Sequence, residues 1–239
     1  MTNPTAAMLV IGDEILSGRT RDSNMYYLAG ELTRIGIRLC EVRVVADEHA
    51  AIVAGVNALR GAFDTVFTSG GIGPTHDDIT ADAIVAAFGV PITHRADAMD
   101  LLAKHYERQG LPFNEARQRM ARIPDGAQLI ENPVSTAPGF TLQNVHVMAG
   151  VPSIFQAMLA SVLPGLTGGA PLLSQSLRVM RGEGEIAGDF AKLAAEFPEL
   201  QLGSYPFNTN GVYGTNLVIR GTDAGMLDRA MTRLSAMFA

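Results

Sequence analysis

A glycine-rich turn between a strand-like run and a helix-like run constrains the fold of this chain more than any other feature. The apolar run 65–67 predicts a buried strand, and apolar residues at helical spacing follow from 81 to 88. Three glycines and a proline lie between them, in Ser69-Gly-Gly-Ile-Gly-Pro74. Such a turn lets backbone N–H groups approach phosphate oxygens, and the helix N-terminus adds partial positive charge. The segment therefore predicts a strand–loop–helix unit that binds a phosphorylated ligand.

Two adjacent carboxylates, Asp77 and Asp78, follow these glycines. Beside a phosphate they would repel it unless a divalent cation lay between the negative charges. The segment thus suggests a metal-dependent site, although it matches neither the P-loop nor the dinucleotide-binding pattern. A structural explanation of Asp78 stays open, because acidic residues near a helix start favour the helix dipole, and Thr75 or Thr80 could cap the helix. For Asp82, inside the helix, the structural explanation is the stronger one.

Strand-like and helix-like segments alternate along the first two thirds of the chain. The predicted strands are 7–11, 37–45, 65–67 and 145–148. The predicted helices are 23–34, 50–59, 81–88, 96–109, 113–122 and 154–163. This alternation indicates an α/β domain with a mostly parallel sheet covered by helices on both faces. Ligands bind such sheets beyond the carboxyl ends of the strands.

The pattern changes after the glycine- and proline-rich segment 163–171, which we interpret as a linker. Beyond it, strands are predicted at 176–180, 200–205 and 216–220, and helices at 185–196 and 224–237. This β-α-β-β-α order predicts a small α+β domain with its helices on one sheet face. The predicted domains are therefore 1–165 and 172–239.

Composition and charge exclude several classes of protein. The formal net charge of −6 gives no basic footprint, so nucleic acid is not an expected partner. No apolar run approaches the roughly 20 residues of a membrane span, and the start lacks the positive charge of a signal peptide. The single cysteine, Cys40, excludes an internal disulfide and fits a reducing compartment, so we expect a cytoplasmic protein. We predict Cys40 to be a buried, small apolar residue of its strand.

The loop after the first predicted strand carries further carboxylates at the same edge of the sheet. Gly12 permits a sharp exit from the strand, and Asp13 and Glu14 follow it directly. A structural explanation is equally open, in which Asp13 holds a turn and Asp22 or Ser23 caps the next helix.

A third loop, 131–140, contains two prolines and a glycine. Its prolines make it stiffer than an ordinary connecting loop. Its Asn132, Ser135 and Thr136 offer neutral hydrogen-bonding groups to a base or a ribose. A purely structural turn explains these residues equally well.

Together these motifs resemble the molybdopterin-binding domain superfamily. Within it, they are most similar to the amino-terminal part of the competence/damage-inducible protein A (CinA) family, and eukaryotic FAD synthases carry a similar domain. The resemblance covers about residues 5–165, and segments 182–187 and 203–207 resemble the small domain that follows in that family. The motifs that carry it are Gly12-Asp-Glu-Ile-Leu16 with Asp22 and Asn24, 69–80, Asn132 with Ala137-Pro-Gly-Phe140, and Gly150-Val-Pro152.

The resemblance implies a three-layer α/β/α domain with divalent-metal-dependent pyrophosphatase activity on ADP-ribose or FAD-like dinucleotides. It implies Asp13, Asp77 and Asp78 as catalytic acids, with Asp13 and Asp78 holding Mg²⁺, Mn²⁺ or Co²⁺. The ligand would be a phosphorylated, nucleotide-like small molecule, and a homodimer is expected because the family tends to self-associate. The residues expected to bind the ligand are Gly12, Ser69, Gly70, Gly71, Gly73, Asn132 and Gly139.

The sequence also departs from the family pattern. The family often has an acidic residue where this chain has Ile154, and the sequence ends at Ala239, so we do not expect the nicotinamide-nucleotide amidase activity of longer members. Two alternatives to the pyrophosphatase stay open. One is a molybdopterin nucleotidyltransferase, although related adenylyltransferases have an arginine where this chain has Asp77. The other is a pterin- or nucleotide-binding module without catalysis.

Overall fold

The computed structural model describes residues 3–238. The chain divides into two compact units, Met1–Gly169 and Ala170–Ala239. This division falls inside the segment that was interpreted as a linker. Gly169 still belongs to the first unit, where its N–H donates a hydrogen bond to the carbonyl of Ile35 at 3.0 Å.

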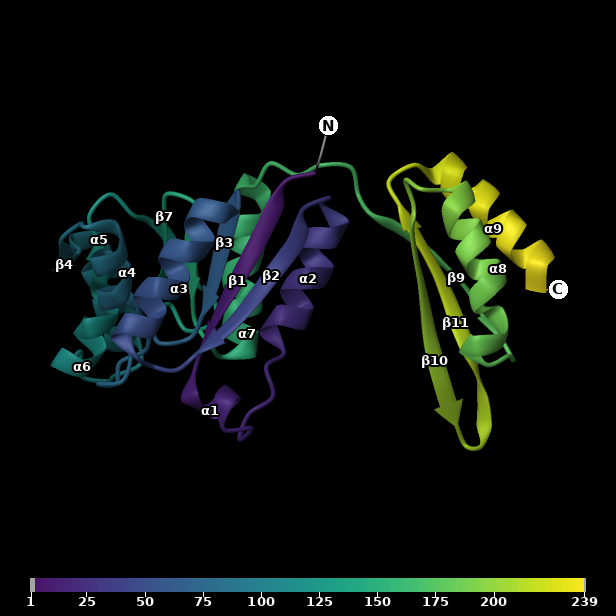
Figure 1. The fold of residues 1–239 in the computed structure, drawn as a ribbon. Helices are drawn as coiled ribbons and strands as arrows, with labels where there is room; N and C mark the ends of the chain where they lie inside the picture. The colour runs from purple at the N-terminus through teal and green to yellow at the C-terminus, as the bar shows by residue number, and fades with distance from the viewer. Residues whose placement is uncertain (1–2, 239) are drawn as a thin grey trace. The chain divides into compact units, whose positions relative to one another are not determined.

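The first unit is built on a six-stranded sheet with the strand order β2-β1-β3-β8-β7-β6 (Figure 1). Its strands are β1 Thr5–Ile11, β2 Arg38–Val45, β3 Thr65–Ser69, β6 Gln128–Ile130, β7 Gly139–Leu142 and β8 Val145–Met148. The four strands β2, β1, β3 and β8 run parallel. At one edge, β7 pairs antiparallel with β8, and β6 pairs antiparallel with β7. The predicted α/β class with a mostly parallel sheet is confirmed.

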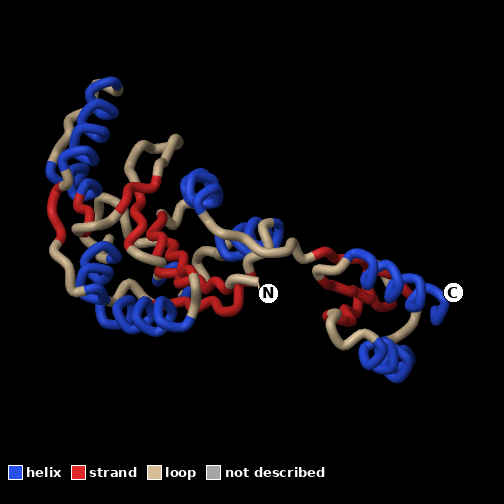
Figure 2. The backbone as a smooth tube through the Cα atoms, turned by 90° about the horizontal axis from the view of Figure 1, so that it is seen from above, coloured by secondary structure: helices blue, strands red, loops and turns tan. Residues whose placement is uncertain are grey.

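Helices cover both faces of this sheet, which gives three layers (Figure 2). The helices are α1 Asp13–Leu16, α2 Asn24–Arg34, α3 His49–Ala62, α4 Thr80–Phe88, α5 Ala96–Arg108, α6 Glu115–Gln118 and α7 Pro152–Val162. Successive residues of β1 point to opposite faces, as strand geometry requires. Leu9 belongs to the core with α3 and α4, while Met8 and Val10 belong to the core with α2 and α7.

The order of the parallel strands creates a topological switch point between β1 and β3. The chain leaves β1 towards β2 on one side, and returns to form β3 on the other side of β1. The loops that follow β1 and β3 therefore diverge and open a crevice at the carboxyl ends of the strands, where ligands bind in α/β sheets. In Figure 1, α1 marks this end of the sheet.

The predicted helix over 113–122 is wrong beyond its first part. The chain forms only the short α6, a 3-10 turn Arg119–Ala121 and the strand β5 Arg122–Pro124, which pairs with β4 Ile92–His94. Pro124 favours extended backbone at Ile123, and the pairing of β5 with β4 extends this conformation to Arg122.

Cys40 is exposed, so the prediction of a buried thiol is also wrong. It lies in β2, an edge strand of the sheet, on which every second residue is exposed. The apolar pattern of the segment was read correctly as a strand, but its place at the sheet edge was not visible in the sequence.

The second unit has the predicted β-α-β-β-α order, and the α+β class is confirmed. Its elements are β9 Leu173–Val179, α8 Glu183–Glu196, β10 Gln201–Thr209, β11 Val212–Gly221 and α9 Ala224–Phe238. The antiparallel sheet has the order β10-β11-β9. Leu217 and Ile219 of β11 pack with Leu193 of α8 and Leu234 of α9, so both helices cover the same sheet face.

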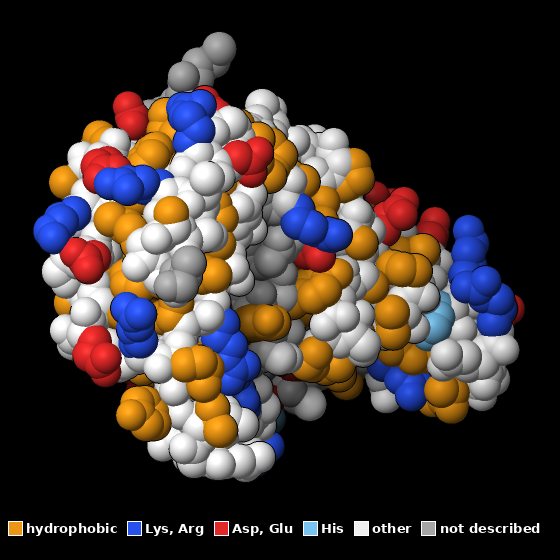
Figure 3. Space-filling view, turned by 90° about the vertical axis from the view of Figure 1, so that its right-hand side faces the viewer, with side chains coloured by type: hydrophobic (Ala, Val, Ile, Leu, Met, Phe, Trp, Pro, Cys, Tyr) orange, Lys and Arg blue, Asp and Glu red, His pale blue; other side chains and the backbone are white. Residues whose placement is uncertain are grey.

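The surface carries charges of both signs. On the face shown in Figure 3, acidic and basic side chains are interspersed. Among residues 3–238, no helix is long and apolar enough to cross a membrane.

Candidate functional site

The loop after β3 adopts backbone angles that favour glycine. Gly70 has a φ of +114° and Gly71 a φ of +67°, a region that residues with a Cβ rarely adopt. A Cβ on Gly70 would lie 2.2 Å from the carbonyl oxygen of Ile11, and one on Gly71 would lie 2.2 Å from Thr80 Oγ1. The two glycines therefore let the loop pack directly against the end of β1 and the first turn of α4.

We call the segment 70–79, between β3 and α4, the glycine loop. Thr80 holds this loop in place. Its side chain is fully buried, and its Oγ1 donates to the carbonyl of Gly70 at 3.0 Å. Its backbone N–H donates to the carbonyl of Gly71, also at 3.0 Å. Thr80 thus acts on the loop rather than on the helix, and no side chain caps the start of α4.

Asn24, the first residue of α2, joins the end of β3 to the loop after β8. Its side chain is 3% exposed, and its Nδ2 donates to Ser69 Oγ at 2.8 Å and to the carbonyl of Gly150 at 2.7 Å. Ser69 ends β3, and Gly150 follows β8. The Oδ1 of Asn24 is buried without a hydrogen-bond partner among residues 3–238, an arrangement that costs about 1–3 kcal/mol. A ligand donor that reaches this oxygen would remove that cost.

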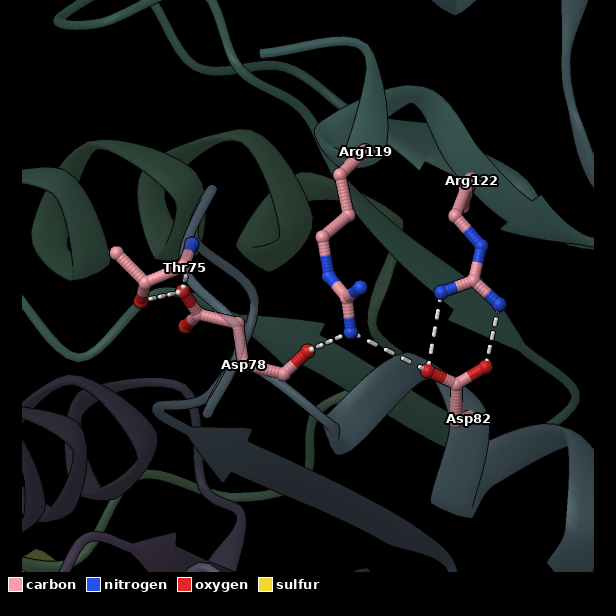
Figure 4. Close-up of polar contacts among 5 residues, drawn as sticks. All are labelled: Thr75, Asp78, Asp82, Arg119 and Arg122. Carbon is pink, nitrogen blue, oxygen red and sulfur yellow. Dashed lines mark hydrogen bonds and ion pairs between the residues drawn. The ribbon is translucent and has the colours of Figure 1, made fainter. Parts of the chain in front are cut away.

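The carboxylate of Asp78 closes a tight turn in the glycine loop (Figure 4). Its Oδ2 accepts hydrogen bonds from the N–H of Thr75 at 2.8 Å and from Thr75 Oγ1 at 2.6 Å. This turn accounts for one oxygen of Asp78. Asp78 thus has a structural role in this turn, whereas neither Thr75 nor Thr80 caps α4. Its other oxygen, Oδ1, is left for a ligand.

Asp47, which follows β2, lies close enough to carboxylates of the loops after β1 and β3 for their negative charges to act on it. The N–H of Asp13 donates to Asp47 Oδ2 at 2.9 Å. Partial burial raises the pKa of Asp47 above its usual value, as do the negative charges of Asp13, Glu14 and Asp77, while the hydrogen bond from Asp13 opposes the rise. We call these four residues the acidic cluster. The charge of Asp77, from the loop after β3, thus acts on Asp47, a residue that the sequence did not reveal as part of the site.

We expect Asp47→Asn to raise the melting temperature of the metal-free protein at about pH 7, where carboxylates are ionised. The ionised carboxylate is partly buried and repelled by its neighbours, whereas asparagine keeps an oxygen for the Asp13 N–H. Because the folded-state pKa is raised, this cost is present above that pKa and disappears as the pH falls below the usual value. Thermal unfolding in EDTA should therefore show a gain that shrinks towards about pH 4. A gain of equal size at both pH values would contradict the electrostatic origin.

The acidic cluster offers the ligand chemistry that a hard divalent cation prefers. Mg²⁺ is usually bound by one or two carboxylates and completes its shell with waters and phosphate oxygens. Among residues 3–238, no group of three His, Cys, Asp or Glu side chains forms a ready metal cage. The residues fit a cation that is shared between protein and phosphates, because the mutual repulsion around Asp47 would be relieved by its charge.

Asp22 has a structural role at the start of α2. Its carboxylate accepts from the N–H of Asn24 at 3.3 Å and from the N–H of Met25 at 3.0 Å. It thereby accepts hydrogen bonds from N–H groups at the start of α2, which have no partner within the helix. It also fixes the backbone from which Asn24 reaches the site.

The third loop contributes to the site through its backbone shape. Asn132 donates to Ser135 Oγ and to the carbonyl of Ala137, and its Oδ1 accepts from two N–H groups of the same loop. All four hydrogen bonds of this amide are used to hold the loop. Gly139 begins β7, where a Cβ would lie 2.4 Å from the carbonyl of Val147 on the neighbouring strand. Both residues thus shape the loop that carries Pro138 to the glycine loop.

Two arginines that sequence reasoning missed lie beside the glycine loop. Arg119 and Arg122 line a small recess of about 20 Å³ together with Gly71, Gly73 and Pro138. Because the segment was predicted to be one continuous helix, its arginines were assigned to no site. The signal that would have placed them is Pro124, which indicates a strand next to them.

Comparison with known protein families shows which family this chain belongs to. The sequence profile described as "Probable molybdopterin binding domain" matches residues 7–168. The chain belongs to the molybdopterin-binding domain family. A second profile, described as "FAD synthase, middle domain", matches residues 171–239. The small second unit is therefore of the kind found in FAD synthases.

Individual relatives agree with this assignment. A "CinA-like protein" of Citrifermentans bemidjiense is 38% identical over 167 residues, which cover 68% of this chain and 40% of the relative. A "Probable FAD synthase" of Caenorhabditis elegans is 30% identical over 98% of this chain, which spans 50% of that relative. The crystal structure of CinA from Thermoplasma acidophilum, a protein described as of unknown function, superposes with a TM-score of 0.63 at 30% identity. It covers 69% of this chain and 99% of its own.

These relatives confirm the resemblance to CinA and to FAD synthases. This member of the molybdopterin-binding domain family has the three-layer fold that the resemblance implied, followed by an FAD-synthase-type second unit.

Proposed function

We propose that this protein is a divalent-metal-dependent pyrophosphatase that hydrolyses the phosphoanhydride of ADP-ribose or FAD-like dinucleotides. The observation that carries the proposal is the junction of the glycine loop with the acidic cluster. Gly70 and Gly71 present backbone at positive φ, as phosphate-binding loops do. The charges of Asp77, from the same loop, and of Asp13 and Glu14, from the loop after β1, all act on Asp47, which follows β2. The relation to a "Probable FAD synthase" supports FAD-like ligands, because FAD contains such an anhydride.

Each part of the site has a distinct role in this reaction. The N–H of Gly70 donates to the carbonyl of Met148 at 3.1 Å. The N–H groups of the loop after Gly70 bind the non-bridging oxygens of one phosphate and orient the anhydride. The proposed metal ligands are Asp13 and Asp78, which binds through Oδ1. Asp47 contributes a further negative charge beside the metal. Asp77 accepts a proton from the attacking water. When bound, a divalent cation supplies positive charge that stabilises the pentacoordinate phosphorus and the departing phosphate.

The bond changes define the products. Water adds to one phosphorus of the anhydride, the bridging P–O bond breaks, and the departing phosphate keeps its electron pair. ADP-ribose then gives AMP and ribose 5-phosphate, and FAD gives AMP and FMN. Incubation with ADP-ribose, with FAD, and with ATP plus molybdopterin, each with Mg²⁺, Mn²⁺ or Co²⁺, separates this function from adenylate transfer. Chromatography should detect AMP from the dinucleotides only when metal is present, and adenylated molybdopterin alone would contradict the proposal.

A second candidate is a binding module without catalysis. It is favoured by the absence of a ready metal cage among residues 3–238. The same experiment distinguishes it, because a binding module retains ADP-ribose or molybdopterin without forming products.

We expect a chain truncated after Gly169 to keep its metal-dependent activity. The glycine loop, the acidic cluster and Asn24 all lie in the first unit, which has its own two cores. The cut belongs after Gly169 because its N–H still donates to Ile35. The measurement is kcat/KM for ADP-ribose on a monodisperse sample. A folded truncated chain that binds ADP-ribose normally but hydrolyses none of it would show that the second unit supplies a catalytic group.

A further inference from the structure

Two arginines beside the glycine loop share one carboxylate (Figure 4). Both oxygens of Asp82 pair with the fork of Arg122, with a distance of 3.0 Å from Nη1 to Oδ2. The Nη2 of Arg119 lies 3.7 Å from the same Oδ2, beyond hydrogen-bond distance. Because Arg122 already occupies the carboxylate, the positive charge on Arg119 is only weakly compensated.

Arg119 also keeps most of its hydrogen-bonding capacity. A guanidinium group has five N–H donors in a fixed plane. Among residues 3–238, Arg119 makes its two polar contacts through Nη2 alone, to the carbonyl of Asp78 at 3.2 Å and to Asp82. Its side chain is 32% exposed. The Nε and Nη1 groups are therefore left for a ligand, while Nη2 fixes the direction of the side chain.

The position of Arg119 relates the glycine loop to a larger groove. It lines the small recess with Gly71 and Gly73. It also lines an open groove of about 510 Å³, together with Pro74, His76 and Glu115 among others. A ligand that starts on the glycine loop and continues into this groove passes Arg119 and Arg122, which line both the recess and the groove.

We propose that Arg119 binds the second phosphate of a diphosphate-linked nucleotide whose first phosphate lies on the glycine loop. The ligand class rests on the proposed function. The planar fork of arginine matches two phosphate oxygens, and the sugar or ring beyond the second phosphate occupies the groove. Arg122 is a positioning residue, because it occupies Asp82 and leaves Arg119 free for the ligand. A monophosphate reaches the glycine loop alone, so Arg119 selects diphosphate-linked ligands over monophosphates.

Titration calorimetry with Arg119→Gln tests this assignment. ADP-ribose and AMP are the probes, and EDTA prevents turnover. We expect ADP-ribose affinity to fall at least tenfold, which is about 1.4 kcal/mol, and AMP affinity to stay unchanged. Arg119→Lys should recover part of the loss, because it restores the charge without the fork. Arg117→Gln is the matched control, since Arg117 lies over the Tyr106 ring at 4.3 Å and lines neither cavity.

Several outcomes would overturn the assignment. Equal losses for ADP-ribose and AMP, or no loss for either, would remove Arg119 from the second phosphate position. The assignment would also be overturned if the unchanged protein bound no ADP-ribose, either in EDTA or with Mg²⁺. Binding through Arg119 without hydrolysis under any metal would refute the proposed function and leave this assignment intact. Hydrolysis with an unchanged KM in Arg119→Gln would refute only the assignment.

Discussion

Replacing Gly71 by valine is expected to weaken ligand binding severely. The variant places a β-branched side chain at a φ of +67°, with its Cβ 2.2 Å from Thr80 Oγ1. The left-handed backbone alone costs about 1–2 kcal/mol, and relieving the contact moves the glycine loop away from α4. The N–H groups then leave the phosphate position. We expect the affinity for ADP-ribose, measured by titration calorimetry, to fall roughly 100-fold, or about 2.8 kcal/mol.

Gly89→Val provides a matched control. Gly89 ends α4 with the same φ of +67°, but a Cβ there would meet no atom within 4 Å. This variant carries the same backbone cost without the contact at the loop. It should melt at a lower temperature and bind ADP-ribose normally. Equal affinities of the two variants would show that the packing of Gly71 on Thr80 does not shape the site.

Asp78→Asn is expected to remove most of the metal-dependent hydrolysis while the protein stays folded. Asparagine can still accept the two hydrogen bonds from Thr75 through its one carbonyl oxygen, so the turn is kept. With that oxygen occupied, the amide nitrogen takes the place of Oδ1, and an uncharged NH₂ group donates hydrogen bonds and does not bind a cation. Loss of a metal contact costs several kcal/mol of transition-state stabilisation, which corresponds to about 100-fold or more in kcat/KM for ADP-ribose.

Asp223→Asn controls for the general effect of removing such a carboxylate. Asp223 accepts a hydrogen bond from the N–H of Met226 at the start of α9, in the second unit. Its variant should hydrolyse ADP-ribose at the normal rate. Normal turnover in a folded Asp78→Asn protein would instead remove Asp78 from the reaction.

Hydrophobic periodicity predicted the elements that have large apolar faces. The buried strands β1, β3 and β8 are apolar runs followed by turns, and the helices α2 and α4 have clear spacing. The strands β4 to β7 were missed because each has only three or four residues, too few to show alternation. Their pairing depends on long-range contacts, which local propensity does not encode.

The sequence located the glycine loop but not the residues that support it. Asn24 reaches partners 45 and 126 positions away, so its role follows from the fold alone. Asp47 is one acid in an ordinary turn, and becomes important because β2 lies beside β1. Arg119 was assigned to a helix that in fact ends at Gln118, and its place beside Gly71 depends on that early end.

Hydrolysis of ADP-ribose in ¹⁸O-labelled water tests the central claim most directly. The unchanged protein is incubated with ADP-ribose and Mg²⁺, Mn²⁺ or Co²⁺, and the molecular masses of the products are measured by mass spectrometry. We predict AMP and ribose 5-phosphate in equal amounts, one of them carrying a single ¹⁸O atom, and no products in EDTA. Intact ADP-ribose with every metal, in a folded protein that binds it, would contradict the pyrophosphatase and leave a binding module.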